Sequence, residues 1–316
     1  GNMYWKDSFF DALFPIDERV ISVPYCLKRP SYREEYLDRL IPNRKKANVE
    51  LALKILEENI PNKVYKYRTF SEYSLTNFRN DTIWITNPKN FNDPFDSISI
   101  DSDISLKEIH DKWDDSVKQM AIDDESKDVY RDIHEKFNSI IGQEALEKIS
   151  EVIKWATTER TQHTFKVACL SETNASVLMW SHYSNDHKGF CIEYNGQEIY
   201  NNELIKKRFL PVKYIDENEK QIPISALALD YPGLYAVLCK ANIWSYEKEW
   251  RICFGIEENL KPSNIQLPKS TGVYIGAKML GEHRKTIIDI AKTKNIPIYQ
   301  EVLEFSSRSI SFERIM

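Results

Sequence analysis

Hydrophobic positions recur at helical spacing in two blocks of the chain and follow strand-like patterns elsewhere. The first block, residues 1–62, closes with four apolar residues that lie three or four positions apart: Val49, Leu53, Leu56 and Ile60. The second block, residues 104–160, carries three further stripes of this kind. Apolar residues at this spacing cover one face of a helix. The pattern therefore predicts a helical N-terminal extension over 1–62 and a helical insertion over 104–160.

Short segments rich in aromatic and β-branched residues predict the strands of a core domain over 63–316. Eight segments fit this description: 63–68, 82–86, 165–171, 190–194, 209–214, 249–255, 272–276 and 296–300. Helices are expected at 174–187, ended by Gly189, and at 231–242 and 280–294. Strands and helices follow in an irregular order rather than in a steady β-α-β-α alternation. We therefore expect an α+β fold with a mixed or antiparallel split β-sheet core.

Composition places the chain among globular proteins. Of its 316 residues, 42% are hydrophobic and 29% are charged, and it holds 17 Tyr, 14 Phe and 7 Trp, far more than a disordered chain carries. The net charge of −5 disfavours nucleic acid as a stable partner. No apolar run approaches the roughly 20 residues that span a bilayer, and the first residues do not resemble a signal peptide. We expect no membrane association, and the pattern leaves the oligomeric state open.

Glycine and cysteine usage argues against several kinds of site. The nine glycines form neither GxGxxG nor GxxxxGK[ST], so no dinucleotide fingerprint or P-loop is expected. The five cysteines are widely spaced and include no CxxC pair. Three of them lie in apolar runs, where cysteine behaves as a small buried hydrophobe. These features predict a cytoplasmic protein with no structural metal.

Four stretches combine polar and aromatic side chains in ways that a plain core does not require. The first is YKYRTF. On a strand, Tyr65 and Tyr67 would face one way, while Lys66 and Arg68 would face the other. This stretch fits either an amphipathic strand with its cations in water or a binding surface.

The second stretch is FNDPFD. Asn92 and Asp93 ahead of a proline suit a tight turn, which Phe91 and Phe95 would anchor. Asp93 and Asp96 could instead hold a divalent cation through oxygen ligands. The capped loop is the simpler interpretation.

The third stretch is CLSETNASVLMWSHYSNDHKGFCIEY. A helix here would carry Leu178, Trp180, His182 and Tyr183, which cannot all point into the core, and Ser181 lies among them. His182 and His187 are five positions apart, which fits the i, i+4 spacing of a metal pair poorly. Tyr183 at the edge of a pocket could stack on a base or a nicotinamide ring.

The fourth stretch is WSYEKEWRICFG. Its alternation predicts one strand on which Glu247 and Glu249 share a face, with Lys248 between them and Arg251 following. The two glutamates would form either a solvated strand edge or the wall of a site.

Together these stretches, with YIGAKM at 274–279, resemble a bacterial family, the domain-of-unknown-function 2971 family. Its members carry similar words in the same order: a YKYR-like strand, an NDPFD-like turn, the long third segment and a late EKEWR strand. The resemblance covers roughly residues 63–280 and leaves the first 60 residues outside it. The family has no assigned activity.

More distantly, the layout is similar to ADP-ribosyltransferase-like folds. These place a His or Arg on an early strand, an aromatic residue or Ser on a middle element and a Glu on a late strand. The resemblance implies NAD as co-substrate and transfer of ADP-ribose to a protein or nucleic acid. Lys66 stands at the early position, which departs from the pattern because lysine offers a point charge rather than a fork of donors, and Arg68 is the alternative.

The resemblance also implies residue roles. A carboxylate beside the ribose would stabilise the oxocarbenium-like state in which the nicotinamide–ribose bond breaks. Candidate catalytic residues are Glu249, Glu247 and Tyr183. Candidate nucleotide-binding residues are Tyr65, Lys66, Tyr67, Arg68, Asn92, Asp93, Trp180, Ser181, His182 and Arg251.

Two other functions remain open from the residues alone. A metal-dependent nuclease would need the carboxylates of Asp93, Asp96, Glu193 and the Glu247–Glu249 pair to converge on a cation. A non-catalytic nucleotide-binding or interaction module would instead expose an apolar patch on one of the helical blocks.

Overall fold

The computed structural model of the chain describes residues 32–33, 49–94, 96–97, 158, 161–205, 208–216, 236–255 and 260–316. Apart from Thr158, the insertion expected over 104–160 lies outside the described residues, as do Phe95 and most of the extension expected over 1–62. Within that extension, α3 (Val49–Asn59) is a helix, as the apolar spacing predicts. It leads through Pro61 into the first strand.

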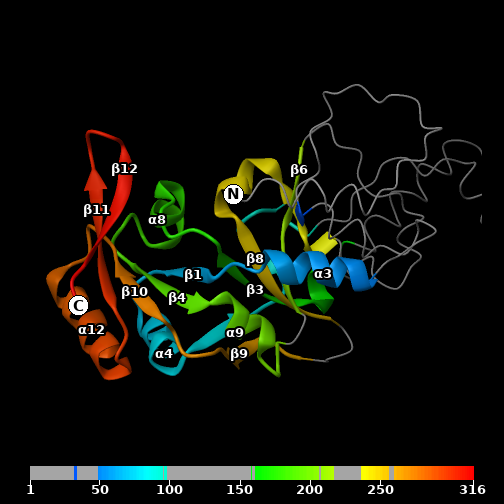
Figure 1. Cartoon of the computed structure of the whole chain (residues 1–316), viewed down its shortest axis with the longest axis horizontal. Coiled ribbons are helices and arrows are strands. Elements are labelled where there is room, and N and C mark those ends of the chain that lie inside the picture. Colours follow the sequence, from blue (N-terminus) through cyan, green and yellow to red (C-terminus); the bar gives the residue numbers. More distant parts are fainter. Residues whose placement is uncertain are drawn as a thin grey trace, which may run out of the picture. The chain divides into compact units, whose positions relative to one another are not determined.

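Among the described residues, eight strands form one sheet in the order β12-β11-β10-β4-β1-β3-β8-β5 (Figure 1). Their bounds are β1 Lys63–Arg68, β3 Lys166–Ser171, β4 Phe190–Asn195, β5 Phe209–Pro211, β8 Glu249–Phe254, β10 Gly272–Ile275, β11 Ile298–Glu304 and β12 Ser309–Arg314. Neighbouring strands are antiparallel except β10 and β11, which are parallel. This mixed, mostly antiparallel sheet with its helices confirms the α+β fold.

Two smaller sheets flank the large one. β2 (Thr82–Ile85) pairs antiparallel with β9 (Ser263–Gln266), and β6 (Lys213–Ile215) pairs parallel with β7 (Cys239–Ala241). Two 3-10 helices, η1 (Pro88–Asn90) and η2 (Asn242–Glu247), follow β2 and β7 in the chain. Through these connections, the small sheets bring two polar loops to the large sheet.

The large sheet is split between β1 and β3. These strands pair at a single register position, Tyr65 with Ser171, whereas β1 pairs with β4 along all six of its residues. At the other end of β3, Thr86 and Val167 exchange two backbone hydrogen bonds of 3.1 and 2.8 Å. Between these two pairings the edge of β3 is open toward β1. A sheet that opens in this way exposes backbone groups and side chains to a ligand or to solvent.

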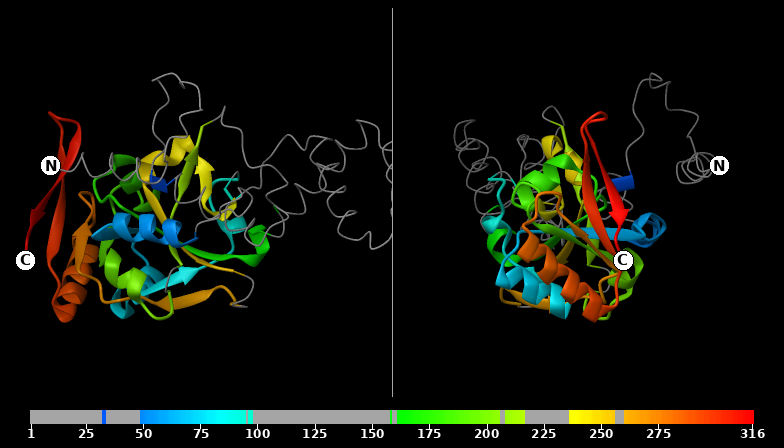
Figure 2. Two further views of the ribbon diagram at one scale, coloured as in Figure 1. Left: turned by 45° about the vertical axis from the view of Figure 1, so that its right-hand side comes forward. Right: turned by 90° about the vertical axis from the view of Figure 1, so that its left-hand side faces the viewer.

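Helices cover both faces of this sheet. On one face, α4 (Glu72–Asn80) and α12 (Gly281–Lys294) lie side by side, and Phe78 of α4 packs on Phe190 of β4 (Figure 2). Residues that neighbour each other along a strand point to opposite faces, and Phe190 pairs with Arg68, so Tyr67 points the other way. There it meets Trp180 of α8 (Val177–Tyr183) edge to face. Within the described part of the chain, no helix is long and apolar enough to cross a membrane.

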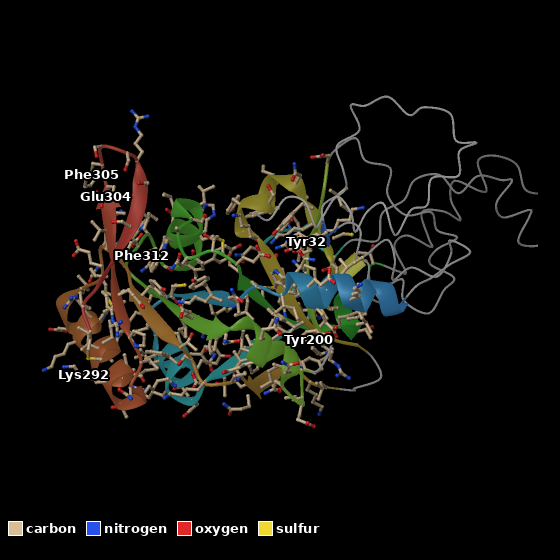
Figure 3. The ribbon with its side chains drawn as sticks, in the orientation of Figure 1. Tyr32, Tyr200, Lys292, Glu304, Phe305 and Phe312 are labelled. Carbon is tan, nitrogen blue, oxygen red and sulfur yellow. The ribbon has the colours of Figure 1, made fainter. Side chains whose placement is uncertain are left out.

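The sheet ends in a hairpin of β11 and β12, shown in red in Figure 3. Phe305 at its tip is 87% exposed. Phe312 lies on the side of the hairpin near α8, with its ring centroid 6.4 Å from that of Trp180. The short helix α9 (Gly196–Asn201) follows β4, where Tyr200 donates a hydrogen bond to Glu57 of α3.

Three expected element bounds are wrong. The segment expected as a helix over 231–242 contains a strand, Cys239–Ala241, because pairing with β6 outweighs its local helical pattern. The segment 209–214 divides into two strands that belong to different sheets. In the stretch from Trp244 to Gly255, the strand begins only at Glu249, because residues 242–247 form η2.

The sequence suggested that Gly189 ends α8, but the structure does not show this. The helix ends at Tyr183, and the left-handed conformation is taken by three consecutive residues, Asn185, Asp186 and His187. Gly189 is needed for close approach instead, since a Cβ there would lie 2.1 Å from the carbonyl oxygen of Arg68. The turn thus packs directly against the backbone of β1.

Candidate functional site

A cavity of about 300 Å³ lies in the split between β1 and β3. Its floor is the open edge of β3 from Val167 to Ser171. Seven aromatic side chains from five elements and one loop line it: Tyr65, Tyr67, Tyr73, Trp84, Phe91, Tyr183 and Trp244. Concave sites with aromatic walls and a few polar groups are typical of small-molecule binding.

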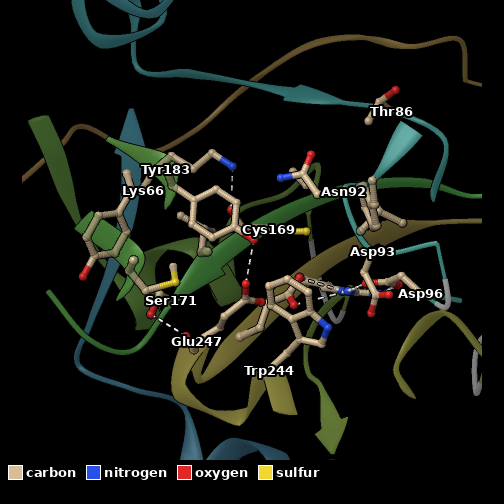
Figure 4. Close-up of a pocket in the computed structure, with 18 of the residues that line it drawn as sticks. Lys66, Thr86, Asn92, Asp93, Asp96, Cys169, Ser171, Tyr183, Trp244 and Glu247 are labelled. Carbon is tan, nitrogen blue, oxygen red and sulfur yellow. Dashed lines mark hydrogen bonds and ion pairs between the residues drawn. The ribbon is translucent and has the colours of Figure 1, made fainter. Parts of the chain in front are cut away.

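Lys66 spans the split. Its ammonium group donates a 2.8 Å hydrogen bond to the carbonyl oxygen of Cys169, on the open edge of β3 (Figure 4). Burial lowers the pKa of Lys66 from its ordinary value. Arg68, two residues on, is half-buried and holds its guanidinium over the ring of Tyr73. The two cations therefore line the cavity rather than project into bulk water.

Glu247 and Glu249 meet at one lysine. Glu247 is the last residue of η2 and Glu249 the first of β8, so they do not share a strand face as the alternation predicts. Lys248 between them is in the left-handed conformation, with φ of 43°. Their carboxylates both accept hydrogen bonds from Nζ of Lys240, at 2.6 and 3.1 Å. The turn at Lys248, rather than the strand period, brings the two carboxylates together.

Arg251 fixes the position of Glu249 in this pair of glutamates. Its guanidinium makes a two-pronged contact with Asp96, with N–O distances of 2.8 and 2.6 Å, and donates from Nε to Glu249 at 2.7 Å. It also donates to the carbonyl oxygen of Val237. The Arg251 side chain is fully buried, and these bonds engage all three of its nitrogens. Arg251 thus holds the site's acidic groups in place rather than offering its donors to a ligand.

The two glutamates have pKa values shifted in opposite directions. Burial raises the pKa of Glu249, but Arg251 and Lys240 outweigh burial and hold the pKa well below its usual range. Burial and the charge of Glu249 raise the pKa of Glu247, and Lys240 only partly offsets them. Environments that separate the pKa values of two nearby carboxyl groups are a recurrent feature of acid–base sites.

Tyr183 completes this group from α8. Its hydroxyl donates a 2.6 Å hydrogen bond to Glu247, and its ring lies beside Lys66 on the wall of the cavity (Figure 4). Burial and the neighbouring Glu247 raise the pKa of Tyr183. The helix begins at Ser176, whose side chain accepts a hydrogen bond from the Met179 amide, and Met179 and Tyr183 lie one turn apart on the face toward the cavity.

The loop of the second stretch lines the opposite wall. Asn92 and Asp93 both line the cavity, Asn92 exposed and Asp93 buried. Figure 4 shows them across from Tyr183 and Lys66. Phe91 packs under Arg251, with the guanidinium 5.1 Å from its ring centre, and so anchors the loop as expected.

Three candidate residues lie away from the cavity lining. Trp180 is fully buried, and its indole donates to the carbonyl oxygen of Asn174. His182 is exposed and contacts the hydroxyl of Tyr246 at 3.3 Å. The hydroxyl oxygen of Ser181 lies 3.3 Å from Nε2 of His187. The helix turns these side chains away from the face that carries Tyr183.

The carboxylates that a metal site would need do not share a position for a metal ion, since Asp96, Glu247 and Glu249 meet around the cations of Lys240 and Arg251. Glu193 lies on β4, where Thr271, Tyr274 and Lys63 donate to its two oxygens. Asp96 is engaged by Arg251. Among the described residues, no group of three or more His, Cys, Asp or Glu side chains is arranged to hold a metal ion.

Sequence reasoning missed Lys240 and Trp244. Lys240 lies on β7, inside a segment expected to be helical, and its ammonium group also lies 5.1 Å from the ring centre of Trp244. The quoted stretch WSYEKEWR begins at Trp244, which is the one sequence signal that pointed to it. Lys240 had no such signal, because only the pairing of β6 with β7 places it between the two glutamates.

Residues 179–252 match the model of a family described as a protein of unknown function, DUF2971. The match runs from α8 to β8 and so includes Tyr183, Lys240, Glu247, Glu249 and Arg251. It supports the family that the sequence motifs resemble. Neither the curated proteins nor the solved structures gave a match to this chain.

Proposed function

We propose that the chain is an NAD-dependent ADP-ribosyltransferase-like enzyme whose substrate binds in the split of the sheet. The observation that carries this proposal is the pair Glu247 and Glu249, which share Lys240 beside an aromatic-lined cavity and have pKa values shifted in opposite directions. The cavity, at about 300 Å³, is at the lower end of the range for small-molecule sites. It suits the nicotinamide–ribose half of the dinucleotide.

The proposed reaction breaks the bond between nicotinamide and the ribose C1′ carbon. Nicotinamide leaves with the bonding electrons, the ribose passes through an oxocarbenium-like state, and the acceptor's nucleophile forms the new bond at C1′. Glu249, with its lowered pKa, contributes the fixed negative charge that stabilises this state. Glu247, with its raised pKa, takes the proton that the acceptor releases.

The remaining side chains fit binding roles. Tyr183 donates to Glu247 and orients that carboxylate. Trp84 and Tyr73, which are 40% and 47% exposed at the cavity, offer flat surfaces on which an aromatic base can stack. Lys66 and Arg68 place two cations on β1, where they can bind the pyrophosphate.

The positions of three residues also agree with the pattern of the transferase-like folds. Lys66 is on an early strand, Tyr183 on a middle helix and Glu249 on a late strand. Of the other two functions, the nuclease is less well supported, because Asp96 and Glu193 face Arg251 and Tyr274 instead of a shared cation position. A non-catalytic nucleotide-binding module would use the same cavity without the reaction.

Calorimetric titration with NAD⁺ and with ADP-ribose tests binding, and release of nicotinamide tests the reaction. We expect the wild type to bind both ligands saturably and to release nicotinamide. Glu247→Gln should still bind ADP-ribose but should release nicotinamide about 100-fold more slowly, as is typical when a general base is lost.

Glu198→Gln is the matched control, since Glu198 is exposed on α9 and is not among the cavity residues. It should behave like the wild type in both assays. Binding without nicotinamide release in every variant would favour the non-catalytic module. No binding by a folded wild type would overturn the proposal.

A further inference from the structure

Three side chains outside the cavity form a hydrogen-bonded chain. The hydroxyl of Ser181 lies 3.3 Å from Nε2 of His187, and Nδ1 of the same ring lies 2.7 Å from Glu301 Oε1. The other oxygen of Glu301 accepts a hydrogen bond from the Ala277 amide at 2.8 Å. We propose that these hydrogen bonds make Ser181 a nucleophile, and that Ser181, His187 and Glu301 form a second catalytic site whose substrate is an activated acyl ester.

The three residues come from separate elements that the turn after α8 brings together. Ser181 is on α8, His187 is in the turn and Glu301 is on β11. His187 is held by two backbone hydrogen bonds, from its own amide to the carbonyl oxygen of Trp180 and from the Lys278 amide to its carbonyl oxygen. Its φ of 63° is the last of three consecutive left-handed values at non-glycine residues. Backbone strain of this kind is often found at functional sites.

The hydrogen bonds assign the proton on the imidazole. An ionised carboxylate can only accept hydrogen bonds, so Nδ1 carries the hydrogen that points to Glu301. Nε2 then presents its lone pair to the Ser181 hydroxyl, as a general base must. Burial raises the pKa of Glu301, and its two partners, the Ala277 amide and His187, oppose that shift. The His187 ring is further fixed by lying nearly parallel to the indole of Trp180, at 9°.

Solvent exposure differs among the three residues as a nucleophilic site requires, with a buried base and an accessible nucleophile. His187 and Glu301 are 4% and 2% exposed, whereas Ser181 is half-buried and reaches solvent. Partly buried apolar side chains of β11 and β12, Tyr299, Ile310 and Phe312, pack against the cluster that contains Trp180 (Figure 3). An acyl group of apolar character would find its contacts there.

The reaction proceeds in two balanced steps. Ser181 Oγ attacks the carbonyl carbon of the ester and its proton passes to Nε2 of His187. His187 gives that proton to the alcohol or phenol, which leaves with the electrons of the broken C–O bond. Water then attacks the acyl-serine and gives one proton to His187, the bond to Ser181 Oγ breaks, Oγ takes the proton from His187, and the carboxylic acid is released. The same geometry would make Ser181 react with a fluorophosphonate, forming an O–P bond with loss of fluoride.

Labelling of the full chain with a fluorophosphonate probe, followed by peptide mass spectrometry, tests the proposal. We expect the label on Ser181 in the folded wild type and no label at that position in Ser181→Ala. His187→Gln and Glu301→Gln should each slow labelling by at least about 100-fold, because removing the base or its orienting group has effects of this size or larger in serine hydrolases. Hydrolysis of p-nitrophenyl acetate should fall in parallel.

Ser307→Ala is the matched control, since Ser307 is an exposed serine in the β11–β12 turn. It should label and hydrolyse as the wild type does. If Ser181 labels no faster than Ser307, or if labelling is unchanged in a folded His187→Gln or Glu301→Gln, the proposal is wrong and the three residues only fasten α8 to β11. The wild-type label position needs no variant, so the test stands even if one substitution unfolds the chain.

Discussion

At the scale of single residues, the main feature of this molecule is a buried ionic network with one more anion than cations. Asp96, Glu247 and Glu249 surround Arg251 and Lys240, and all five side chains are at most 7% exposed. Removing one partner from such a network leaves an uncompensated buried charge. Burial raises the pKa of Glu247, and the negative charge of Glu249 raises it further although Lys240 contacts both carboxylates.

Arg251→Met should destabilise the fold strongly. The substitution leaves Asp96 and Glu249 without their main donor, and breaking a buried ion pair costs about 3–5 kcal/mol. Arg79→Met is the control, because Arg79 and Glu72 form an exposed pair 3.9 Å apart, for which about 0–1 kcal/mol is expected. Urea unfolding of both variants measures the difference. Equal losses would show that the network contributes no more than a surface pair.

The two glutamates should give opposite pH dependences of stability. The folded-state pKa of Glu249 is lowered, so Glu249 stabilises the fold above its unfolded pKa of about 4.3 and loses that contribution as the pH falls further. The folded-state pKa of Glu247 is raised, so the wild type gains stability as the pH falls through that raised value.

Unfolding midpoints between pH 7 and pH 3 check this prediction. The deficit of Glu249→Gln relative to wild type should be largest at pH 7 and should shrink below about pH 4.3. The deficit of Glu247→Gln should instead grow as the pH is lowered from 7 toward 4.3. Parallel curves for the two variants would contradict the assigned pKa directions.

At the scale of elements, the turn between α8 and β4 places two sites. It lets Tyr183 face the cavity while it brings His187 under Ser181. The turn can do so because it packs without side chains at two points, Gly189 against β1 and Gly276 against the His187 carbonyl oxygen. A small change in this turn should therefore disturb both sites.

Gly189→Ala tests the packing of the turn. The added Cβ would lie 2.1 Å from the Arg68 carbonyl oxygen, a backbone atom that cannot move without shifting β1. We expect a loss of about 1–3 kcal/mol or more in the free energy of unfolding. Gly281→Ala at the start of α12 is the control, because a Cβ there meets nothing within 4 Å and alanine favours a helix. Similar unfolding midpoints in the two variants would rule out the close contact.

At the scale of the whole molecule, the chain segment before the core contributes to the site. Arg33 is buried, and its guanidinium donates to the carbonyl oxygens of Val212 and Glu249 and to the carboxylate of Glu172. Glu172 also accepts from Tyr32 and from the indole of Trp250. Residues far ahead of the expected core domain thus hold the strand that begins with Glu249.

Arg33→Met should weaken both the fold and the site. It removes one donor from each of two buried carbonyl groups and from the Glu172 carboxylate. The Glu249 carbonyl keeps the Val212 amide as a donor, and the carboxylate keeps Tyr32 and Trp250. Each lost hydrogen bond costs about 1–3 kcal/mol. We expect a loss of a few kcal/mol in urea unfolding and weaker binding of ADP-ribose. Lys285→Met, at an exposed position of α12, serves as the control and should change neither measurement by much. Unchanged unfolding of Arg33→Met would show that this contact is not held in solution.

Much of the local structure follows from the sequence because local spacing determines it. The alternation in YKYR separates Tyr67 from Lys66 on β1, and the apolar spacing gives α3 and α12 close to their observed bounds. The motif words also identified most cavity residues, since those words hold polar and aromatic side chains in combinations that a plain core does not require. For the same reason the α+β class could be predicted.

The features that only the tertiary structure decided all depend on contacts between segments that are distant in the sequence. Long-range contacts create the split between β1 and β3, place Lys240 between two glutamates and connect Ser181 to Glu301 through His187. These contacts join residues that lie far apart in the chain or on elements whose type was predicted wrongly. No spacing rule reports such contacts, because the free energy of strand pairing is gained between segments rather than within them. The sequence by itself determined which side chains are available for chemistry, and the folded sheet determined which of them meet.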